Sequence, residues 1–400
     1  MPDDPMKRLE AYHPTDSKGD INPPITDSST FAFSRPDLLR AVFHHEAPGC
    51  YLYSRSGNAT LRTLAGALAA LEGSEAAWVT ASGMSAIVVT LMHLAGSGTR
   101  IVASRTIYGG TWALLANWLP RFGVETVFVD INDPDAVAAA VNEDTAAIYC
   151  ETLSNPTLRM PDLPALAHIG RASTAALVVD NTFAPLIVSP LALGADVVVH
   201  SLTKFINGAS DCIAGAICAS EEFIATLGDV NEGTAMILGP VLDSLRAQSI
   251  YKNLATLELR MRRHGANAAY LAERLEEIGL EVIYPGLASH PDHARFDAFA
   301  NPGYGYGGML ALDLETTEAA EDLATRLQDA GLGLLAVSLG GHRTLFSPSG
   351  SSTSSEIPPE MQNQIGLSPG LLRFSIGLDA DIEATWETFA DCLADAGLSG

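Results

Sequence analysis

Lysine, the side chain that can act as an amine nucleophile, is rare in this 400-residue sequence. The chain has only four lysines, Lys7, Lys18, Lys204 and Lys252. The first two lie in a proline-rich N-terminal stretch, and Lys252 lies among polar positions of a predicted helix, where a solvated side chain is expected. Lys204 comes shortly after the apolar run 197–199, at the carboxyl end of a predicted strand, where open α/β sheets build ligand sites. By itself, this position favours catalysis and a surface role about equally.

An acidic residue ends another apolar strand upstream. Asp180 follows Leu177-Val178-Val179, and a buried carboxylate there needs a cation or several hydrogen-bond donors. A structural salt bridge would explain Asp180 alone. The order Asp180, Ser201, Thr203 and Lys204 suggests a sharper alternative, a pyridoxal phosphate site. In such a site the lysine forms a Schiff base, the carboxylate holds the pyridine nitrogen protonated, and the hydroxyls bind the phosphate.

A phosphate also needs backbone N–H donors, and one turn can supply them. In Thr80-Ala81-Ser82-Gly83-Met84, Ser82 can cap the helix that follows and Gly83 allows close approach. An ordinary capped helix would explain this segment taken alone. Tyr108-Gly109-Gly110 places an aromatic ring after the next predicted strand, where it could stack on a planar cofactor or transfer protons; a buried packing tyrosine is the alternative.

Short apolar runs alternate with helical patterns from residue 76 onward, which indicates βαβ units around a mostly parallel, buried sheet. The predicted strands are 76–80, 100–104, 125–129, 146–150, 176–180, 196–200 and 213–219, with helices from residues 83, 110 and 134. Residues 241–278 read as one long amphipathic helix. This alternation places Asp180 and Lys204 at one edge of the sheet.

A smaller α/β unit is predicted after the long helix. Its expected strands are 308–314, 334–338 and 371–375, its helices are 317–330 and 382–394, and the Ser- and Gly-rich stretch 347–355 is expected to be a loop. The predicted organisation is an extended arm over 1–50, a large cofactor-binding domain over 51–262 and a smaller C-terminal domain over 263–400. The fold class is therefore α/β.

Composition narrows the choice of partners. Lys+Arg number 23 against Asp+Glu 47, which gives a net charge of −24 and disfavours nucleic acid and anionic lipid. The five cysteines form no CxxC pair, so neither a disulfide framework nor a structural zinc site is expected, and no metal is predicted. No apolar run is long enough for a membrane span and no signal peptide is evident, so a cytoplasmic enzyme acting on a small molecule is expected.

Several segments, in their order and spacing, resemble the Cys/Met-metabolism family of pyridoxal-phosphate enzymes, and the resemblance covers nearly the whole chain. The matching segments are Tyr53-Ser54-Arg55, Ser82-Gly83-Met84, Tyr108-Gly109-Gly110, Glu151 through Asn155-Pro156-Thr157, Asp180-Asn181-Thr182, Ser201-Leu202-Thr203-Lys204, Ser338-Leu339-Gly340-Gly341 and Leu372-Arg373-Phe374-Ser375. The resemblance implies the aspartate-aminotransferase type of fold, with a large, mostly parallel sheet domain and a smaller C-terminal domain.

The resemblance also implies roles for individual residues. Lys204 would hold the cofactor and move protons, and Tyr108 would stack on the ring and give a proton to a departing thiolate. The residues implied to bind the cofactor are Tyr53, Arg55, Ser82, Gly83, Met84, Tyr108, Asn155, Asp180, Ser201, Thr203 and Lys204. Of these, Tyr53 and Arg55 would serve a neighbouring subunit's phosphate, which implies a homotetramer with shared sites. Arg373, with Ser338, would bind the substrate carboxylate.

The implied reaction is elimination or replacement at Cγ of a sulfur amino acid. Relatives that cleave cystathionine often carry a Glu where this chain has Val337, and the 347–356 segment resembles that of plant-type methionine γ-lyases; both favour methionine. Two departures count against methionine. Bacterial methionine γ-lyases usually have a cysteine where this chain has Gly110, and a Lys-Asp pair where this chain has Ala235-Met236. The glycine at position 110 would widen the pocket. We therefore expect α,γ-elimination of methionine, with γ-replacement on an activated homoserine or cystathionine γ-lyase chemistry as alternatives.

Overall fold

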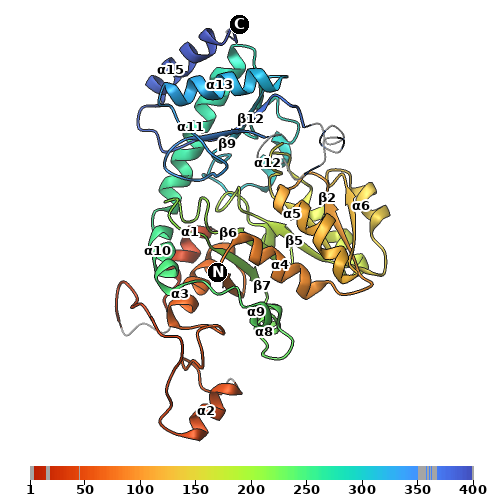
Figure 1. Cartoon of the computed structure of the whole chain (residues 1–400), viewed down its shortest axis with the longest axis vertical. Coiled ribbons are helices and arrows are strands. Elements are labelled where there is room, and N and C mark those ends of the chain that lie inside the picture. The colour runs from red at the N-terminus through yellow and green to blue at the C-terminus, as the bar shows by residue number, and fades with distance from the viewer. Residues whose placement is uncertain are drawn as a thin grey trace.

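The computed structural model describes residues 4–14, 19–44, 46–349 and 367–398, together with Ile357, Glu360 and Gln362. Figure 1 shows three parts stacked along the long axis: a helix-flanked sheet at the centre, a second sheet with helices near the C-terminus, and an N-terminal segment at the opposite end. Most of the Ser-rich stretch 347–355 lies outside the described residues.

The central sheet has seven strands within the described residues, in the order β1-β7-β6-β5-β4-β2-β3. These are β1 (Ala76–Thr80), β2 (Arg100–Ser104), β3 (Glu125–Val129), β4 (Thr145–Glu151), β5 (Ala176–Asp180), β6 (Val197–Ser201) and β7 (Gly215–Ala219). Only β7 runs antiparallel to its neighbours. The α/β class with a mostly parallel sheet is thus confirmed, and the apolar strands follow from burial on both faces.

Helices cover both faces of the central sheet. On one face the core includes Leu64 and Leu68 of α3 (Ala59–Glu72) and Leu166 of α7 (Leu163–Ser173). On the other it includes Ile87 and Leu91 of α4 (Gly83–Leu94). Further helices of this layer are α5 (Gly109–Ala113), α6 (Pro134–Ala140), α8 (Glu221–Leu227) and α9 (Thr234–Leu238). The carboxyl ends of the parallel strands therefore form one rigid edge.

The second sheet has the order β10-β11-β12-β9-β8 and is antiparallel except for the β10–β11 pair. Its strands are β8 (Glu281–Ile283), β9 (Met309–Asp313), β10 (Leu334–Leu335), β11 (Leu345–Pro348) and β12 (Leu371–Ser375). It packs against α11 (Leu257–Glu277), α13 (Thr317–Asp329) and α15 (Ile382–Asp395), with α12 (His293–Phe299) nearby. The predicted strand 334–338 is only two residues long, and β8 and β11 were not predicted because such short strands show little periodicity.

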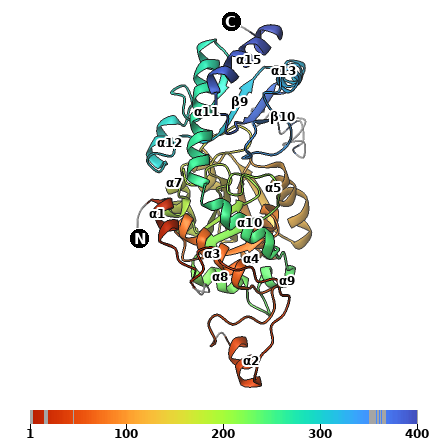
Figure 2. The ribbon, with the colours of Figure 1, turned by 90° about the vertical axis from the view of Figure 1, so that its left-hand side faces the viewer.

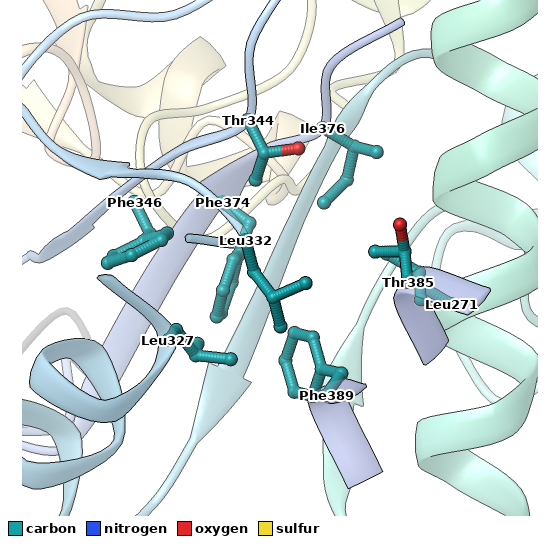
Figure 3. A pocket seen from close by; sticks show the side chains of 9 residues that line it. All are labelled: Leu271, Leu327, Leu332, Thr344, Phe346, Phe374, Ile376, Thr385 and Phe389. Atoms are coloured by element: carbon teal, nitrogen blue, oxygen red, sulfur yellow. The ribbon is translucent and has the colours of Figure 1, made fainter. Parts of the chain in front are cut away.

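The core of this second layer contains one small cavity, shown in Figure 3. Phe346, Phe374 and Phe389 line it together with Thr344 and Thr385. Its volume is about 10 Å³, which is about the space needed for one water molecule. It is therefore a packing gap and not a ligand site.

The predicted long helix 241–278 is instead two helices. α10 (Ser244–Leu254) ends before Thr256, and α11 begins at Leu257. At the break, the Asn253 carbonyl accepts hydrogen bonds from the Thr256 N–H at 3.2 Å and from the Arg260 side chain at 3.1 Å. Because a side chain satisfies a carbonyl freed at the helix end, the chain can turn there without leaving it unpaired. The amphipathic helical pattern continues on both sides of the break, so the sequence does not indicate where α10 ends.

Helix α11 passes from the central layer to the second layer (Figure 2). Leu257 and Met261 lie in the core beneath the central sheet, whereas Leu271 and Leu275 lie in the core of the second sheet. The domain boundary predicted at residue 262 falls inside this helix. The division into a large and a small domain stays a prediction.

The N-terminal arm is less extended than predicted, because it contains α1 (Pro5–Ala11) and α2 (Pro36–Phe43). Both begin with proline, which is compatible with the first turn because that N–H needs no helical partner. Figures 1 and 2 both show α2 set apart from the rest of the chain. Ile21 and Phe43 of the arm, and Tyr53 just after it, expose apolar surface. None of the helices in the described residues is long and apolar enough to span a membrane.

Candidate active site

Three neighbouring parallel strands bring acidic and basic groups to one edge of the central sheet. Glu151 ends β4, Asp180 ends β5, and these two residues are register partners. Ser201 ends β6, and Lys204 lies in the turn three residues later. The structure therefore places the predicted amine and the predicted carboxylate at the edge expected from the sequence.

Lys204 is held against a loop of the second layer. Its Nζ atom donates a hydrogen bond to Ser338 Oγ at 3.1 Å. Burial lowers the pKa of Lys204 to about 8, and the positive charge of Arg373 acts in the same direction. About a tenth of this amine is thus neutral at pH 7, compared with well under a hundredth for an ordinary lysine, and the neutral form is the one that a nucleophile or proton acceptor requires.

Asp180 is enclosed in the sheet edge. Burial raises its pKa, while hydrogen bonding to Thr182 and the neighbouring His200 act in the opposite direction. The Thr182 N–H donates to Asp180 Oδ1 at 2.9 Å. No arginine or lysine forms an ion pair with Asp180 in the described ranges. The structural salt bridge considered for this residue is therefore absent from these ranges.

His200 faces the opposite side of the sheet, where it pairs with an acid from α3. Its Nε2 atom lies 2.7 Å from Glu72 Oε1, and both side chains are almost fully buried. Glu72 Oε1 also accepts a hydrogen bond at 3.3 Å from Asn181, the residue that follows Asp180. Glu72 of α3 thus links the ends of β5 and β6 through Asn181 and His200.

A second network links Glu151, Asn155 and Arg373. Glu151 accepts the N–H groups of Tyr108 and Asn155, and Asn155 Oδ1 accepts a bond from Arg373 Nη1 at 2.9 Å. Burial, and then the charge of Asp180, raises the pKa of Glu151 to about 8, and Arg373 opposes this shift. The motif containing Glu151 was noted in the sequence, but no role was assigned because its partners are backbone groups of loops distant in sequence.

Arg373 is buried on β12 and points toward the strand ends. Burial lowers its pKa to about 10, which still leaves the guanidinium charged at neutral pH. Its Nη2 atom donates to the Ser338 carbonyl at 3.4 Å, and its Nε–H finds no acceptor in the described part of the chain. A buried guanidinium with an unsatisfied donor is suited to binding a carboxylate.

The predicted phosphate cradle is formed by the start of α4 and the end of β6. Ser82 caps α4 by accepting the Ser85 N–H at 3.0 Å, and helix geometry leaves the N–H groups of Gly83 and Met84 without intrahelical acceptors. A Cβ atom on Gly83 would lie 2.6 Å from Ser201 Cβ, so glycine is required for this contact. Thr203 Oγ1 is bonded to both backbone groups of Ala214, which fixes the turn before Lys204.

Tyr108 is the residue just before α5, and it is 40% exposed. A Cβ atom on Gly110 would lie 2.6 Å from Cε1 of the Tyr108 ring. The sequence led us to expect that Gly110 widens the pocket. In the structure it does not, because the Tyr108 ring lies against that position. A larger residue at 110 would force the ring to move.

Tyr53 and Arg55 lie just after the arm, before α3 begins. The Arg55 guanidinium carbon is 5.8 Å from the centre of the Tyr53 ring, and Arg55 Nη1 donates to the Met236 carbonyl on α9 at 3.3 Å. These contacts do not join either residue to Lys204 or Asp180 of the same chain. They leave open the predicted role at a neighbour's site.

Helix α11 supplies polar contacts that sequence reasoning missed. Arg260 donates to the carbonyls of Phe205 and Ile206, just after Lys204. One turn later His264 Nδ1 contacts the Ile376 carbonyl at 2.6 Å, and Asn267 donates to the carbonyls of Gly377 and Asp379. The helix thus binds the lysine turn and the segment after Arg373. The i, i+4, i+7 spacing was visible, but its backbone acceptors were not.

Comparison with known proteins agrees with this geometry. Residues 8–393 match the family described as Cys/Met metabolism PLP-dependent enzyme. The chain is 45% identical to a methionine gamma-lyase of Arabidopsis thaliana, over 94% of this chain and 87% of that one. It superposes on cystathionine gamma synthase of Xanthomonas oryzae with a TM-score of 0.89 at 32% identity, covering 99% of both chains. An O-acetylhomoserine (thiol)-lyase structure from Campylobacter jejuni has a TM-score of 0.88 at 28% identity, covers 96% of this chain and 99% of that one, and contains a pyridoxyl-lysine monophosphate.

The protein is accordingly a pyridoxal-phosphate enzyme with the fold of that class, as the resemblance implied. The chain belongs to the Cys/Met-metabolism family of PLP-dependent enzymes and is a carbon–sulfur lyase.

The residues present fit pyridoxal phosphate. The site contains a half-buried amine of lowered pKa, a half-buried carboxylate at the end of β5, and the partly exposed Tyr108. The close approach between Gly83 and Ser201 brings the helix N-terminus next to a strand-end hydroxyl, a donor arrangement suited to phosphate. We propose that Lys204, Asp180, Tyr108, Asn155 and the start of α4 hold the cofactor.

The pKa of Lys204 predicts how the apoprotein captures pyridoxal phosphate. Only the neutral amine attacks an aldehyde, so the capture rate should rise about tenfold per pH unit below pH 8 and level off above it. Stopped-flow absorbance of apoprotein mixed with the cofactor between pH 6 and pH 10 measures this profile. Free Nα-acetyllysine, tested in parallel, should keep rising to about pH 10. A protein profile that also rises to pH 10 would contradict the assigned pKa.

Proposed function

We propose that the protein catalyses α,γ-elimination of L-methionine, giving methanethiol, α-ketobutyrate and ammonia with consumption of water. The observation that carries this proposal is the apolar side chain of Val337. It is 66% exposed and directly precedes Ser338, whose hydroxyl contacts the Lys204 amine. A thioether tail can lie against valine, whereas the charged distal end of cystathionine would find no partner in this side chain.

Residues of this chain would bind and orient the amino acid. Arg373 would bind its carboxylate through two N–H groups, and the buried position of the guanidinium strengthens that bond. Ser338 accepts a hydrogen bond from Arg373 through its carbonyl and one from Lys204 through its hydroxyl. It would therefore keep Lys204 next to the carboxylate bound by Arg373. This arrangement sets the α-carbon close to the lysine amine.

Proton transfers would fall to two side chains. Bound pyridoxal phosphate supplies an electron sink that makes the protons on Cα and Cβ acidic. The Lys204 Nζ atom, with its lowered pKa, would accept and return these protons. The hydroxyl of Tyr108, at the mouth of the site, would give a proton to the departing methanethiolate. Both assignments rest on the position of these groups at one strand edge.

Gamma-replacement is the second candidate function. The chain closely resembles structures described as a cystathionine gamma synthase and an O-acetylhomoserine (thiol)-lyase. O-acetylhomoserine would lose acetate from Cγ, and the thiol would form a C–S bond at that carbon, with the thiol proton leaving with the acetate as acetic acid.

The deciding experiment is incubation of the holoenzyme with methionine and no added thiol, followed by assay of α-ketobutyrate and methanethiol. Cystathionine and O-acetylhomoserine are tested in parallel. Release of both products from methionine in equal amounts supports elimination. No reaction with methionine, combined with consumption of O-acetylhomoserine only in the presence of a thiol, would assign the protein to γ-replacement.

We further propose a homotetramer with sites shared between subunits. The arm exposes apolar side chains at Ile21 and Phe43, and Tyr53 just after it is also exposed; such a surface is typical of a segment that packs on a second copy. Arg55 and Tyr53 immediately follow the arm and make no contact with the lysine of their own chain in the described hydrogen bonds. A neighbour's phosphate is the anion that these side chains would bind.

Arg55→Ala should weaken cofactor retention, and subunit mixing shows where Arg55 acts. Homooligomers of Arg55→Ala and of Lys204→Ala are each expected to have impaired sites. In hybrids, the site that combines Lys204 from one chain with Arg55 from the other is intact, so up to about a quarter of the wild-type sites should return after mixing and refolding. Turnover of the mixture measures this recovery. If the mixture is no more active than its parts, Arg55 does not serve a neighbour's site.

A further inference from the structure

Glu151 places one carboxylate between two loops of the site. Its Oε1 atom accepts the Tyr108 N–H at 2.7 Å, and its Oε2 atom accepts the Asn155 N–H at 2.8 Å. Tyr108 follows β2, whereas Asn155 follows β4, so the two donors lie on separate loops. The carboxylate is buried, with 7% of the residue exposed. Both oxygens are therefore used within the protein.

The same carboxylate acts on the substrate side of the site through Asn155. The Asn155 side chain accepts a hydrogen bond from Arg373 Nη1 at 2.9 Å. The positive charge of Arg373 in turn favours the ionised form of Glu151. Fixing the Asn155 backbone consequently fixes the acceptor that orients the guanidinium.

We propose that Glu151 is a positioning residue that sets the Tyr108 ring and the Asn155–Arg373 pair relative to one another. The proposal rests on the cofactor and substrate contacts proposed above for these three residues. Glu151 itself needs no contact with either the cofactor or the substrate. Its effect passes through two backbone N–H groups.

A carboxyl group is needed here because each of its two oxygens accepts a backbone N–H. A glutamine has the same shape but presents one carbonyl oxygen and one NH₂ group, and the NH₂ group would face a backbone N–H donor. One of the two loops would lose its hydrogen bond and be pushed away. Burial and the charge of Asp180 disfavour the ionised form of Glu151, and the two N–H bonds and Arg373 offset only part of that cost.

The test is Glu151→Gln in the holoenzyme, with cofactor affinity and the visible circular dichroism of the bound cofactor as readouts. Leaving one buried backbone N–H without its acceptor should weaken the affinity about 10- to 100-fold. The dichroism should shrink because the ring is no longer held at one angle by Tyr108. Neither readout depends on which amino acid is the substrate, so failure of the methionine assignment would leave the result interpretable.

The matched control is Asp196→Asn. Asp196 also accepts a backbone N–H of a central strand, that of Leu177 at 2.7 Å, but at the amino end of β5. This substitution should lower the melting temperature and leave both cofactor readouts within twofold of wild type. Equal effects of the two substitutions on cofactor binding would overturn the proposal, as would a folded Glu151→Gln protein with wild-type affinity and dichroism.

Two further variants separate positioning from general stability. Glu151→Asp keeps the carboxyl group but is one methylene shorter, so it should retain one N–H bond and fall between wild type and glutamine. It also replaces the glutamine variant if that protein does not fold. In Tyr108→Ala, the ring is already gone, so adding Glu151→Gln should weaken cofactor affinity less than it does in the wild-type background. Additive losses in this cycle would mean that Glu151 does not act through Tyr108.

Discussion

Lys204→Ala is expected to give a colourless protein with no measurable turnover of any sulfur amino acid. The other lysines in the described ranges, Lys7 and Lys252, lie on α1 and α10, so no second amine at the strand edge can replace it. Loss of both the covalent attachment and the proton carrier should reduce turnover at least about a thousandfold. Visible absorbance after dialysis and a coupled α-ketobutyrate assay measure the two effects.

The exposed Lys252 provides the control for this substitution. Lys252→Ala removes an amine from the surface of α10 and should keep both the yellow colour and the turnover. A Lys204→Ala protein that stayed yellow and active would reject the entire assignment of the site.

Arg373→Ala should reduce kcat/KM for methionine about 100- to 5,000-fold. Removing one partner of a buried charge pair costs about 3–5 kcal/mol, because the substrate carboxylate would then enter a buried site without its counter-charge. Loss of the guanidinium also removes the group that favours ionised Glu151. Steady-state kinetics with methionine, together with a melting curve, measure the effect.

A substrate analogue without the carboxylate distinguishes binding from collapse of the site. 3-(Methylthio)propylamine has the amine and the thioether but offers nothing for Arg373 to bind. Wild type and Arg373→Ala should react with it at rates within about tenfold of each other, measured as cofactor absorbance changes. Arg373→Lys, which keeps the charge but not the two-pronged geometry, should recover part of the methionine activity. A full loss with the analogue would show that Arg373 is needed for the fold of the site.

Prediction from the sequence worked best where structure depends on local pattern. The strands at 76–80, 100–104, 125–129 and 176–180 match the structure residue for residue, because buried parallel strands appear as continuous apolar runs. Strand-end geometry then brought Asp180 and Lys204 together. The break between α10 and α11 could not be predicted, since it depends on the Arg260 side chain reaching back to Asn253.

The parts of the site that escaped prediction depend on contacts between distant segments. Glu151 is recognisable as part of a motif, but its function lies in N–H groups that follow two different strands. Gly110 was interpreted as open space because the sequence does not show where the Tyr108 ring folds. Roles for Tyr53 and Arg55 depend on a second chain and stay predictions.

The polar contacts of helix α11 have a consequence for how substrates enter. Arg260 holds the turn that carries Lys204, and His264 and Asn267, further along the same helix, hold the segment that follows Arg373. A hinge rotation of the second sheet away from the central one would have to break these bonds or bend an unbroken helix. We therefore expect substrate to enter without a hinge rotation that separates the two sheets. Surface side chains such as Tyr108 and Val337 would move instead. The distance between the proton carrier and the carboxylate-binding guanidinium would then stay constant through each catalytic cycle.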